Sequence, residues 1–185
     1  MQIDAQLFLK DSEKANSICF FDLECAGLSA DYHALLVGSV KPFTGRAVTF
    51  SASKIGDDKE LSLLIKEELE KYHCWVSYNG KNFDVPFLKT RLLINELGNL
   101  EPRHHIDLYQ HLKYHVRTSR KSQAHLLGTF NLKEEKLSVS PAIWAAAAAN
   151  PYKNIPILRK RCESDVVGLQ ALYNFTKHII INITR

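Results

Sequence analysis

The stretch CWVSYNGKNFDVPFLKTRLL, residues 74–93, decides the fold because it changes from strand character to helix character within a few residues. Residues 74–78 form a short run of apolar and aromatic side chains, typical of a buried strand. Asn79 and Gly80 end that run, and helical spacing resumes over residues 83–97, with proline in the first turn, where it is tolerated. The sequence therefore predicts a strand, a turn and a helix that begins near Asp84.

Working outward toward the N-terminus, three further segments have strand character. Residues 18–21 are an apolar run that ends at Asp22 and Glu24, so both acids lie at the end of a buried strand. Residues 33–40 and 46–51 are apolar or β-branched and are separated by a hairpin-like break. Three strands in succession predict an antiparallel meander.

The remaining segments are mostly helical. Leucine and isoleucine recur at helical spacing over residues 58–72, which predicts an amphipathic helix, and residues 104–108 predict a short strand. A long helix is expected over residues 155–178. The alanine run at residues 145–149 follows a plausible helix start and carries no inferred chemistry. Alternating strands and helices predict the α/β class.

Length and composition favour one globular domain. The chain has 185 residues, of which 45% are hydrophobic and 24% charged, so it can bury one sizeable core and is not expected to be disordered. We expect a single domain over residues 1–185, with its core at about 16–178. The net charge of +4 and pI near 8.8 permit a polyanionic partner without requiring one.

Cysteine usage and the N-terminal segment favour a reducing compartment. The four cysteines lie in apolar segments without a C-x-x-C pair, which favours buried thiols over disulfides. The first ten residues, MQIDAQLFLK, lack a long apolar core and fit neither a signal peptide nor a membrane span. We therefore expect a cytoplasmic protein with no membrane partner.

Four acids have a spacing that suits phosphodiester chemistry. Asp22 and Glu24 are two apart on a strand and point the same way, Asp84 follows the second strand, and Asp165 lies within the last helix. Two cations about 4 Å apart neutralise phosphate charge, generate hydroxide and stabilise the leaving oxygen, and they need clustered carboxylates. Each acid also has an ordinary alternative: strand-end polarity, a helix-start acid favoured by the dipole, or a solvent-facing helix position.

Three segments in this order resemble known motifs: FDLECAGL at residues 21–28, YNGKNFDVPFL at 78–88 and CESDVVGL at 162–169. They are similar to the three motifs of the DnaQ-like, or DEDD, superfamily of 3′–5′ exonucleases, and closest to its bacterial and archaeal branch of predicted exonucleases. The resemblance covers residues 18–175. It implies an RNase H-like fold, with a mixed five-stranded sheet in the order 3-2-1-4-5 and helices on both faces.

The resemblance also implies an activity and a metal site. Such a protein hydrolyses single-stranded DNA or RNA from a 3′ end by a two-metal mechanism. Asp22, Glu24, Asp84 and Asp165 match the acids that bind two Mg²⁺ or Mn²⁺ ions. His105-Ile106-Asp107-Leu108 resembles a further H-x-D-L element, so Asp107 is either an additional acid near the site or a structural residue at a strand end.

Several side chains are candidates for nucleic-acid contact. In the family, the residue at Leu28 packs on the last base, and the basic cluster at residues 117–121 is either a solvated loop or a phosphate-binding surface. The candidate contacts are Leu28, Asn79, Asn82, Arg91, Arg117, Arg120, Lys121 and Arg161. Asn79 and Asn82 are also ordinary turn residues.

The sequence departs from the family pattern at the position of the general base. Active members carry a Tyr four residues before the last Asp, or a His four to five before it, where this chain has Arg161 and Lys160. Three alternatives follow: the metal alone generates hydroxide, another residue supplies the base, or activity is lost. The rival functions are therefore a nucleic-acid-binding module and a structure-specific endonuclease on the same fold. His111 and His115 are four apart, a spacing that also suits zinc.

Overall fold

One mixed sheet organises the chain, and its five strands lie in the order β3-β2-β1-β4-β5. The strands are β1 (Ile18–Cys25), β2 (Leu35–Pro42), β3 (Val48–Ser51), β4 (Cys74–Ser77) and β5 (His104–Asp107). Strands β1, β2 and β3 pair antiparallel, whereas β4 and β5 extend the sheet in parallel from β1. The computed structural model describes residues 4–54, 56–133, 139–180 and 183. The strand order expected from the sequence is confirmed.

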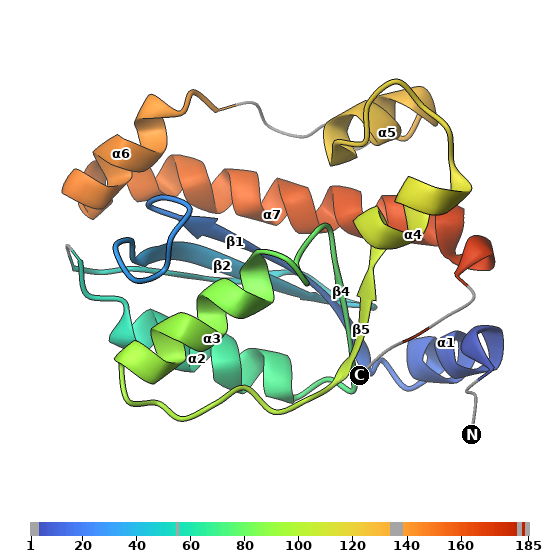
Figure 1. Cartoon of the computed structure of the whole chain (residues 1–185), viewed down its shortest axis with the longest axis horizontal. Coiled ribbons are helices and arrows are strands. Elements are labelled where there is room, and N and C mark those ends of the chain that lie inside the picture. Colours follow the sequence, from blue (N-terminus) through green and yellow to red (C-terminus); the bar gives the residue numbers. More distant parts are fainter. Residues whose placement is uncertain (1–3, 55, 134–138, 181–182, 184–185) are drawn as a thin grey trace.

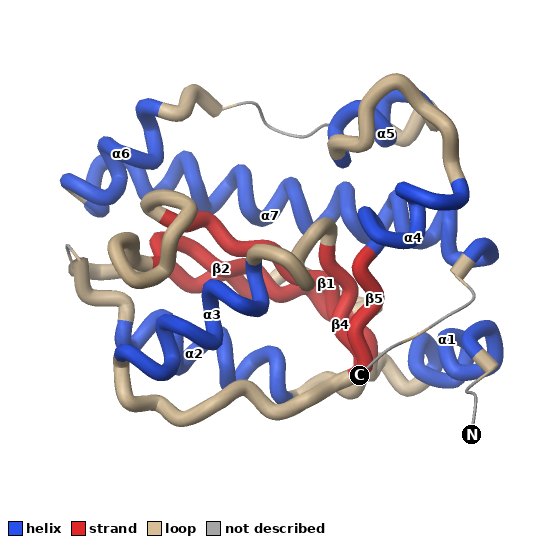
Figure 2. The backbone as a smooth tube through the Cα atoms, viewed as in Figure 1, coloured by secondary structure: helices blue, strands red, loops and turns tan. Residues whose placement is uncertain are grey.

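Helices cover both faces of this sheet (Figures 1 and 2). The helices are α1 (Ala5–Lys14), α2 (Lys59–Glu70), α3 (Asp84–Ile94), α4 (Leu108–His115), α5 (Gln123–Thr129), α6 (Ala142–Ala149) and α7 (Pro151–Thr176), followed by the 3₁₀ turn η1 (Lys177–Ile179). Helices α1, α4, α5 and α7 pack on one face and α2 and α3 on the other. This two-sided arrangement also agrees with the expectation.

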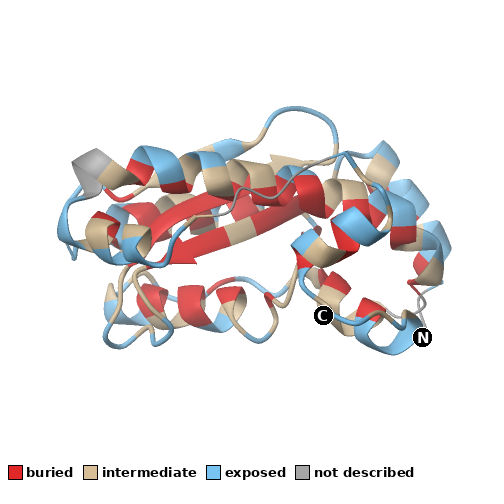
Figure 3. Ribbon diagram, turned by 90° about the horizontal axis from the view of Figure 1, so that it is seen from above, coloured by how far each residue is buried: buried red, intermediate tan, exposed pale blue. Residues whose placement is uncertain are grey.

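Strand β1 lies at the centre of the sheet and divides the core in two. Its side chains alternate, so Ile18 and Phe20 pack against α7 while Cys19 and Phe21 pack against α2 and α3. Every residue of β1 is buried except Asp22, which is half-buried. In Figure 3 the central strands form a buried layer between the helices. A residue on β1 is therefore held from both sides.

Sequence reasoning did not predict helix α1. Asp4 caps it by accepting hydrogen bonds from the amides of Gln6 and Leu7, and Leu9 is buried in the core on the α7 side of the sheet. The segment is mostly polar, and its helical stability comes from this tertiary contact. Helix α7 also begins at Pro151, four residues before the expected start, with proline in its first turn.

Two features of composition can be compared with the structure. All four cysteines, Cys19, Cys25, Cys74 and Cys162, are buried and free, as expected. Among the residues that the structure describes, no helix is long and apolar enough to cross a membrane.

Arg91 forms a buried structural ion pair and is not available as a nucleic-acid contact. Its Nε and Nη2 donate to the two carboxylate oxygens of Asp58 at 2.8 Å, and its Nη1 donates to the carbonyl of Ala30. Asp58 also accepts from the amide of Leu35 at 2.7 Å. This buried bidentate pair joins α3 to the start of β2, so the sequence-based assignment of Arg91 to a substrate surface is corrected.

Removal of this pair gives a prediction about stability. Arg91→Leu leaves Asp58 buried without its cation, so we expect a loss of about 3–5 kcal/mol in the free energy of unfolding, measured by urea denaturation. Lys54→Ala is the matched control because Lys54 forms an exposed ion pair with Asp57, worth less than about 1 kcal/mol. Similar losses in the two variants would contradict a structural role for Arg91.

Candidate metal centre

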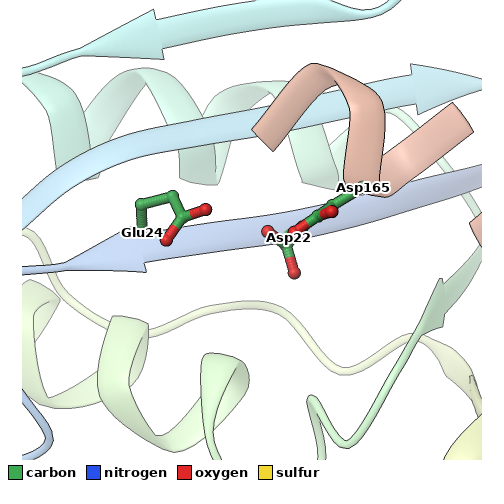
Figure 4. A group of neighbouring side chains, drawn as sticks. All are labelled: Asp22, Glu24 and Asp165. Atoms are coloured by element: carbon green, nitrogen blue, oxygen red, sulfur yellow. The ribbon is translucent and has the colours of Figure 1, made fainter. Parts of the chain in front are cut away.

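Three carboxylates meet where β1 and α7 cross. Asp22 and Glu24 project from β1 and Asp165 from α7, and one oxygen of each lies within 4.8 Å of the others (Figure 4). Glu24 is 6% exposed and Asp165 2% exposed, so two of the three acids are almost fully buried. The spacing of two along a strand and the packing of α7 over β1 together produce this cluster. We call Asp22, Glu24 and Asp165 the carboxylate triad.

A cationic side chain already contacts the triad. Arg161 lies one helical turn before Asp165, and its Nε is 2.7 Å from Oε1 of Glu24 while its Nη2 is 3.5 Å from Oδ2 of Asp165. Its guanidinium lies over the ring of Trp144, 5.1 Å from the centroid. The indole Nε1 of Trp144 donates to Oε2 of Glu24 at 2.7 Å. The structure thus directs Arg161, a candidate phosphate contact from the sequence, toward carboxylates.

Asp84 lies near the triad but outside it. Its Oδ1 accepts a hydrogen bond from the amide of Leu23, the residue between Asp22 and Glu24, at 3.0 Å. The pKa of the Asp84 carboxyl is raised to about 7, mainly by burial and to a lesser extent by the nearby carboxylates of Asp107 and Glu24, while the hydrogen bond from Leu23 opposes the rise. Asp84 therefore fastens the start of α3 to the strand that carries two triad acids.

The turn before α3 needs glycine at position 80, because the backbone there lies close to the side chains of Ser77 and Asp84. A Cβ atom at Gly80 would lie 2.5 Å from Oγ of Ser77 and 3.3 Å from Oδ2 of Asp84. A larger residue would push α3 away from β4. The neighbouring Asn79 adopts a positive φ of 65°, which asparagine tolerates better than most residues.

Asp107 anchors that same turn. Its carboxylate accepts from the amide of Asn79 at 2.8 Å, from the amide of Lys81 at 3.1 Å and, as the cap of α4, from the amide of Tyr109 at 3.1 Å. Asp107 is 1% exposed and does not join the triad. Of the two alternatives that the sequence left open, the structure places Asp107 as a support of the turn that leads to Asp84.

Two hollows border the triad, one at Glu24 and the other at Asp22. One, of about 430 Å³, includes Glu24 and Arg161, and its lining is otherwise mostly apolar: Leu23, Cys25, Ala26, Gly27, Leu28, Phe83, Val139, Pro141 and Trp144. The other, of about 520 Å³, is more polar and is lined by Asp22, Tyr78, Asn79, Tyr109, Lys121, Ser122 and Gln123. We call them the apolar hollow and the polar hollow. Each hollow therefore has one acid of the triad in its lining.

The other predicted contact residues occupy these hollows or their surroundings. Leu28 is 84% exposed at the apolar hollow, and Asn82 donates to the side chain of Asn79 at the polar one. Arg117 and Arg120 are exposed in the loop between α4 and α5. The ammonium of Lys121 donates to the carbonyl of Val116 and to Thr118 within that loop.

The triad is a chemically suitable site for a divalent cation. Its ligands are carboxylate oxygens, which Mg²⁺ and Mn²⁺ prefer, and they lie close enough to share one ion. In the described part of the chain, no other set of three His, Cys, Asp or Glu side chains converges in this way. The zinc alternative based on His111 and His115 therefore lacks a third ligand there.

Comparison with known proteins agrees with this geometry. A sequence model of the RNase_H superfamily matches residues 19–176, which include all of the triad and most of the sheet. The chain belongs to the RNase H superfamily. Nucleases of this superfamily use divalent metals, and the triad could bind such an ion here. No curated protein sequence matches the chain.

A solved structure supports the RNase H-like fold. The family B DNA polymerase from the hyperthermophilic archaeon Pyrobaculum calidifontis superposes with a TM-score of 0.71 at 18% identity. The match covers 86% of this chain and 24% of the polymerase chain, so this chain spans about a quarter of that protein. At this identity the similarity establishes the RNase H-like α/β fold alone.

Sequence reasoning missed Trp144 as a residue of the site. It lies on α6, outside the three motifs and 120 residues from Glu24, and its contact with Glu24 depends on how α6 packs against α7. The contact of Arg161 with Asp165, by contrast, had a signal in the sequence. The two residues are four apart on one helix, so their side chains lie on the same face.

The position of Asp84 gives a prediction about pH. An aspartate has an ordinary pKa of 3.8, and burial raises that of Asp84 to about 7. Between these values the folded chain holds a proton that the unfolded chain has released, so Asp84 makes the free energy of unfolding fall as pH rises. Asp84→Asn removes this contribution, and we expect a shallower fall between about pH 4 and pH 7.

The measurement is urea denaturation at a series of pH values with a chelator present. Asp57→Asn, an exposed substitution near the start of α2, is the control and should keep the wild-type slope. If Asp84→Asn and wild type show the same pH dependence, Asp84 does not retain its proton in the folded chain.

Proposed function

We propose that this chain is a metal-dependent nuclease, and specifically a 3′–5′ exonuclease acting on single-stranded DNA or RNA. The observation that carries the proposal is the carboxylate triad at the crossing of β1 and α7, in a chain of the RNase H superfamily. The triad supplies the hard oxygen ligands that phosphodiester hydrolysis with Mg²⁺ or Mn²⁺ requires.

Each acid has a role in this proposal. Asp22, Glu24 and Asp165 would hold a divalent ion directly. Asp84, which accepts a hydrogen bond from the amide of Leu23, is the candidate fourth acid for a second ion. When bound, such ions supply positive charge to the phosphate and lower the pKa of a bound water. The half-buried Asp22 is the triad acid that also lines the polar hollow, so it would be the most accessible of the three to a substrate.

The two hollows support a path for a single strand. In the apolar hollow, the exposed Leu28 together with Phe83 and Trp144 offers surfaces for a terminal base. In the polar hollow, Asn79, Tyr109 and Lys121 offer hydrogen bonds, stacking and positive charge to the adjoining nucleotides. Arg117 and Arg120 extend the positive surface beyond it.

The alternative is a nucleic-acid-binding module without catalysis. It is favoured by one observation: Arg161 holds Glu24 and Asp165 in ion pairs at the position where the resemblance calls for a general base. Lys160 is exposed. Neither side chain is the Tyr or His that the resemblance implies as general base, so catalysis would need another source of activation for the attacking water.

The activity test uses single-stranded DNA and RNA labelled at the 5′ end, with Mg²⁺ or Mn²⁺. We expect stepwise shortening by wild type and a rate loss of more than about 100-fold in Asp165→Asn, since even outer-sphere partners of metal ligands cost 10–100-fold. Asp31→Asn, in the exposed loop after β1, is the matched control and should keep full activity. Nucleic-acid binding without cleavage by wild type would favour the binding module, and internal cutting of closed circles would indicate an endonuclease.

The exposed arginines give a separate prediction about binding. Replacing both Arg117 and Arg120 with glutamine should weaken single-strand binding and reduce the slope of log K against log salt by about 1.4, or 0.7 for each lost phosphate contact. Arg46→Gln, in the exposed β2–β3 turn at the far end of the β1–β2 pair, is the control. An unchanged salt slope in the double variant would remove the α4–α5 loop from the binding surface.

A further inference from the structure

We infer that Arg161, held in place by Trp144, competes with the divalent ion for Glu24 and Asp165 and so sets the metal affinity of the site. The guanidinium lies against carboxylate oxygens that a divalent ion would need. Metal binding then requires the ion pairs to Arg161 and the hydrogen bond from Trp144 to loosen. This inference rests on the metal site of the proposed function and adds a determinant of its affinity.

Both oxygens of Glu24 are engaged by the protein itself. Oε1 lies 2.7 Å from Nε of Arg161, and Oε2 accepts from the indole of Trp144 at 2.7 Å. Only 6% of Glu24 is exposed, so solvent offers it little alternative. A metal ion that binds Glu24 must therefore displace or stretch at least one contact in a low-dielectric environment, where such contacts are strong.

The second triad acid on the α7 side is engaged by the same guanidinium. Nη2 of Arg161 is 3.5 Å from Oδ2 of Asp165, one helical turn along α7. Arg161 thus bridges the strand acid and the helix acid, which are two of the three ligands that a shared ion would join. A guanidinium and a divalent cation in this space would also repel each other, so the two occupants exclude one another electrostatically.

Trp144 holds Arg161 in the bridging position. The guanidinium lies 5.1 Å from the indole centroid, a cation–π arrangement, and α6 is packed against α7 through the buried Ala147. The indole therefore restrains both partners of the central ion pair, Glu24 by a hydrogen bond and Arg161 by its ring face. Loss of Trp144 should weaken Arg161 as a competitor without changing any charge.

The experiment measures Mn²⁺ binding by isothermal titration calorimetry. Arg161→Gln should bind Mn²⁺ about 10- to 100-fold more tightly than wild type, because the ion pairs to Glu24 and Asp165 no longer compete. Trp144→Phe keeps every charge and an aromatic ring, and should bind about 2- to 10-fold more tightly, because the indole no longer donates to Glu24 or restrains Arg161. Arg159→Gln, two residues earlier on α7 and bonded to Ser51, is the control and should match wild type.

Trp144→Phe separates competition from simple electrostatics. If removal of positive charge alone explained a tighter site, Arg161→Gln would gain affinity and Trp144→Phe would not, and the inference would be overturned. Equal Mn²⁺ affinity in all variants would also overturn it while leaving the metal site intact. Absence of Mn²⁺ binding in wild type and every variant would instead refute the metal site, and with it the proposed function.

Tryptophan fluorescence provides a second readout that does not depend on activity. The chain has two tryptophans, and Trp75 is buried in the core with its indole bonded to the carbonyl of Leu69. Mn²⁺ quenches by its own paramagnetism, so Mg²⁺ is the probe here. Mg²⁺ should change the emission of wild type as Arg161 leaves the ring of Trp144, and Trp144→Phe should show no change. A wild-type emission that stays constant while calorimetry records binding would contradict displacement of Arg161.

Folding of the variants is checked in the same series. Arg161→Gln leaves three carboxylates close together, so its melting temperature without metal should be lower than that of wild type, and Mg²⁺ should raise it by a larger increment. Equal increments in the two proteins would contradict the competition. Circular dichroism before each titration confirms that the variants compared are folded.

Discussion

Repulsion among three carboxylates is the constraint on which the centre of this structure depends. Asp22, Glu24 and Asp165 bring oxygens within 4.8 Å of one another in a largely buried site, where two unit charges repel by about 3–4 kcal/mol at an effective dielectric constant near 20. Such a cluster persists only with positive charge close by. Arg161 supplies it in the chain alone, and a divalent ion would supply it in the proposed enzyme.

The fold resists that repulsion through the rigidity of β1. Neighbouring strands pair with β1 on both edges, helices cover both of its faces, and Asp84 bonds the amide between its two acids. Asp107 in turn fixes the turn that precedes Asp84. The acids are therefore held by the sheet and its hydrogen bonds, and relaxation of the backbone cannot separate them cheaply.

The sequence predicted the sheet order and the α/β class because strand and helix periodicities were clear and the three motifs pointed to one known topology. It also predicted acids that meet, since spacing of two on a strand places Asp22 and Glu24 on one face. It could not predict the buried pair of Arg91 with Asp58, or the contact of Trp144 with Glu24, because both join elements distant along the chain. Helix α1 was not predicted for a similar reason: its stability comes from core packing that local sequence does not reveal.

The triad acids and the loop residues near them differ in how well they tolerate substitution. The acids lie on a central strand and a core helix, where any substitution disturbs packing on several sides. Arg117 and Arg120 lie in an exposed loop, and Leu28 projects from another, where substitutions disturb little. In the proposed nuclease, evolution could therefore alter the nucleic-acid preference one loop residue at a time, while the chemistry at the triad stayed the same.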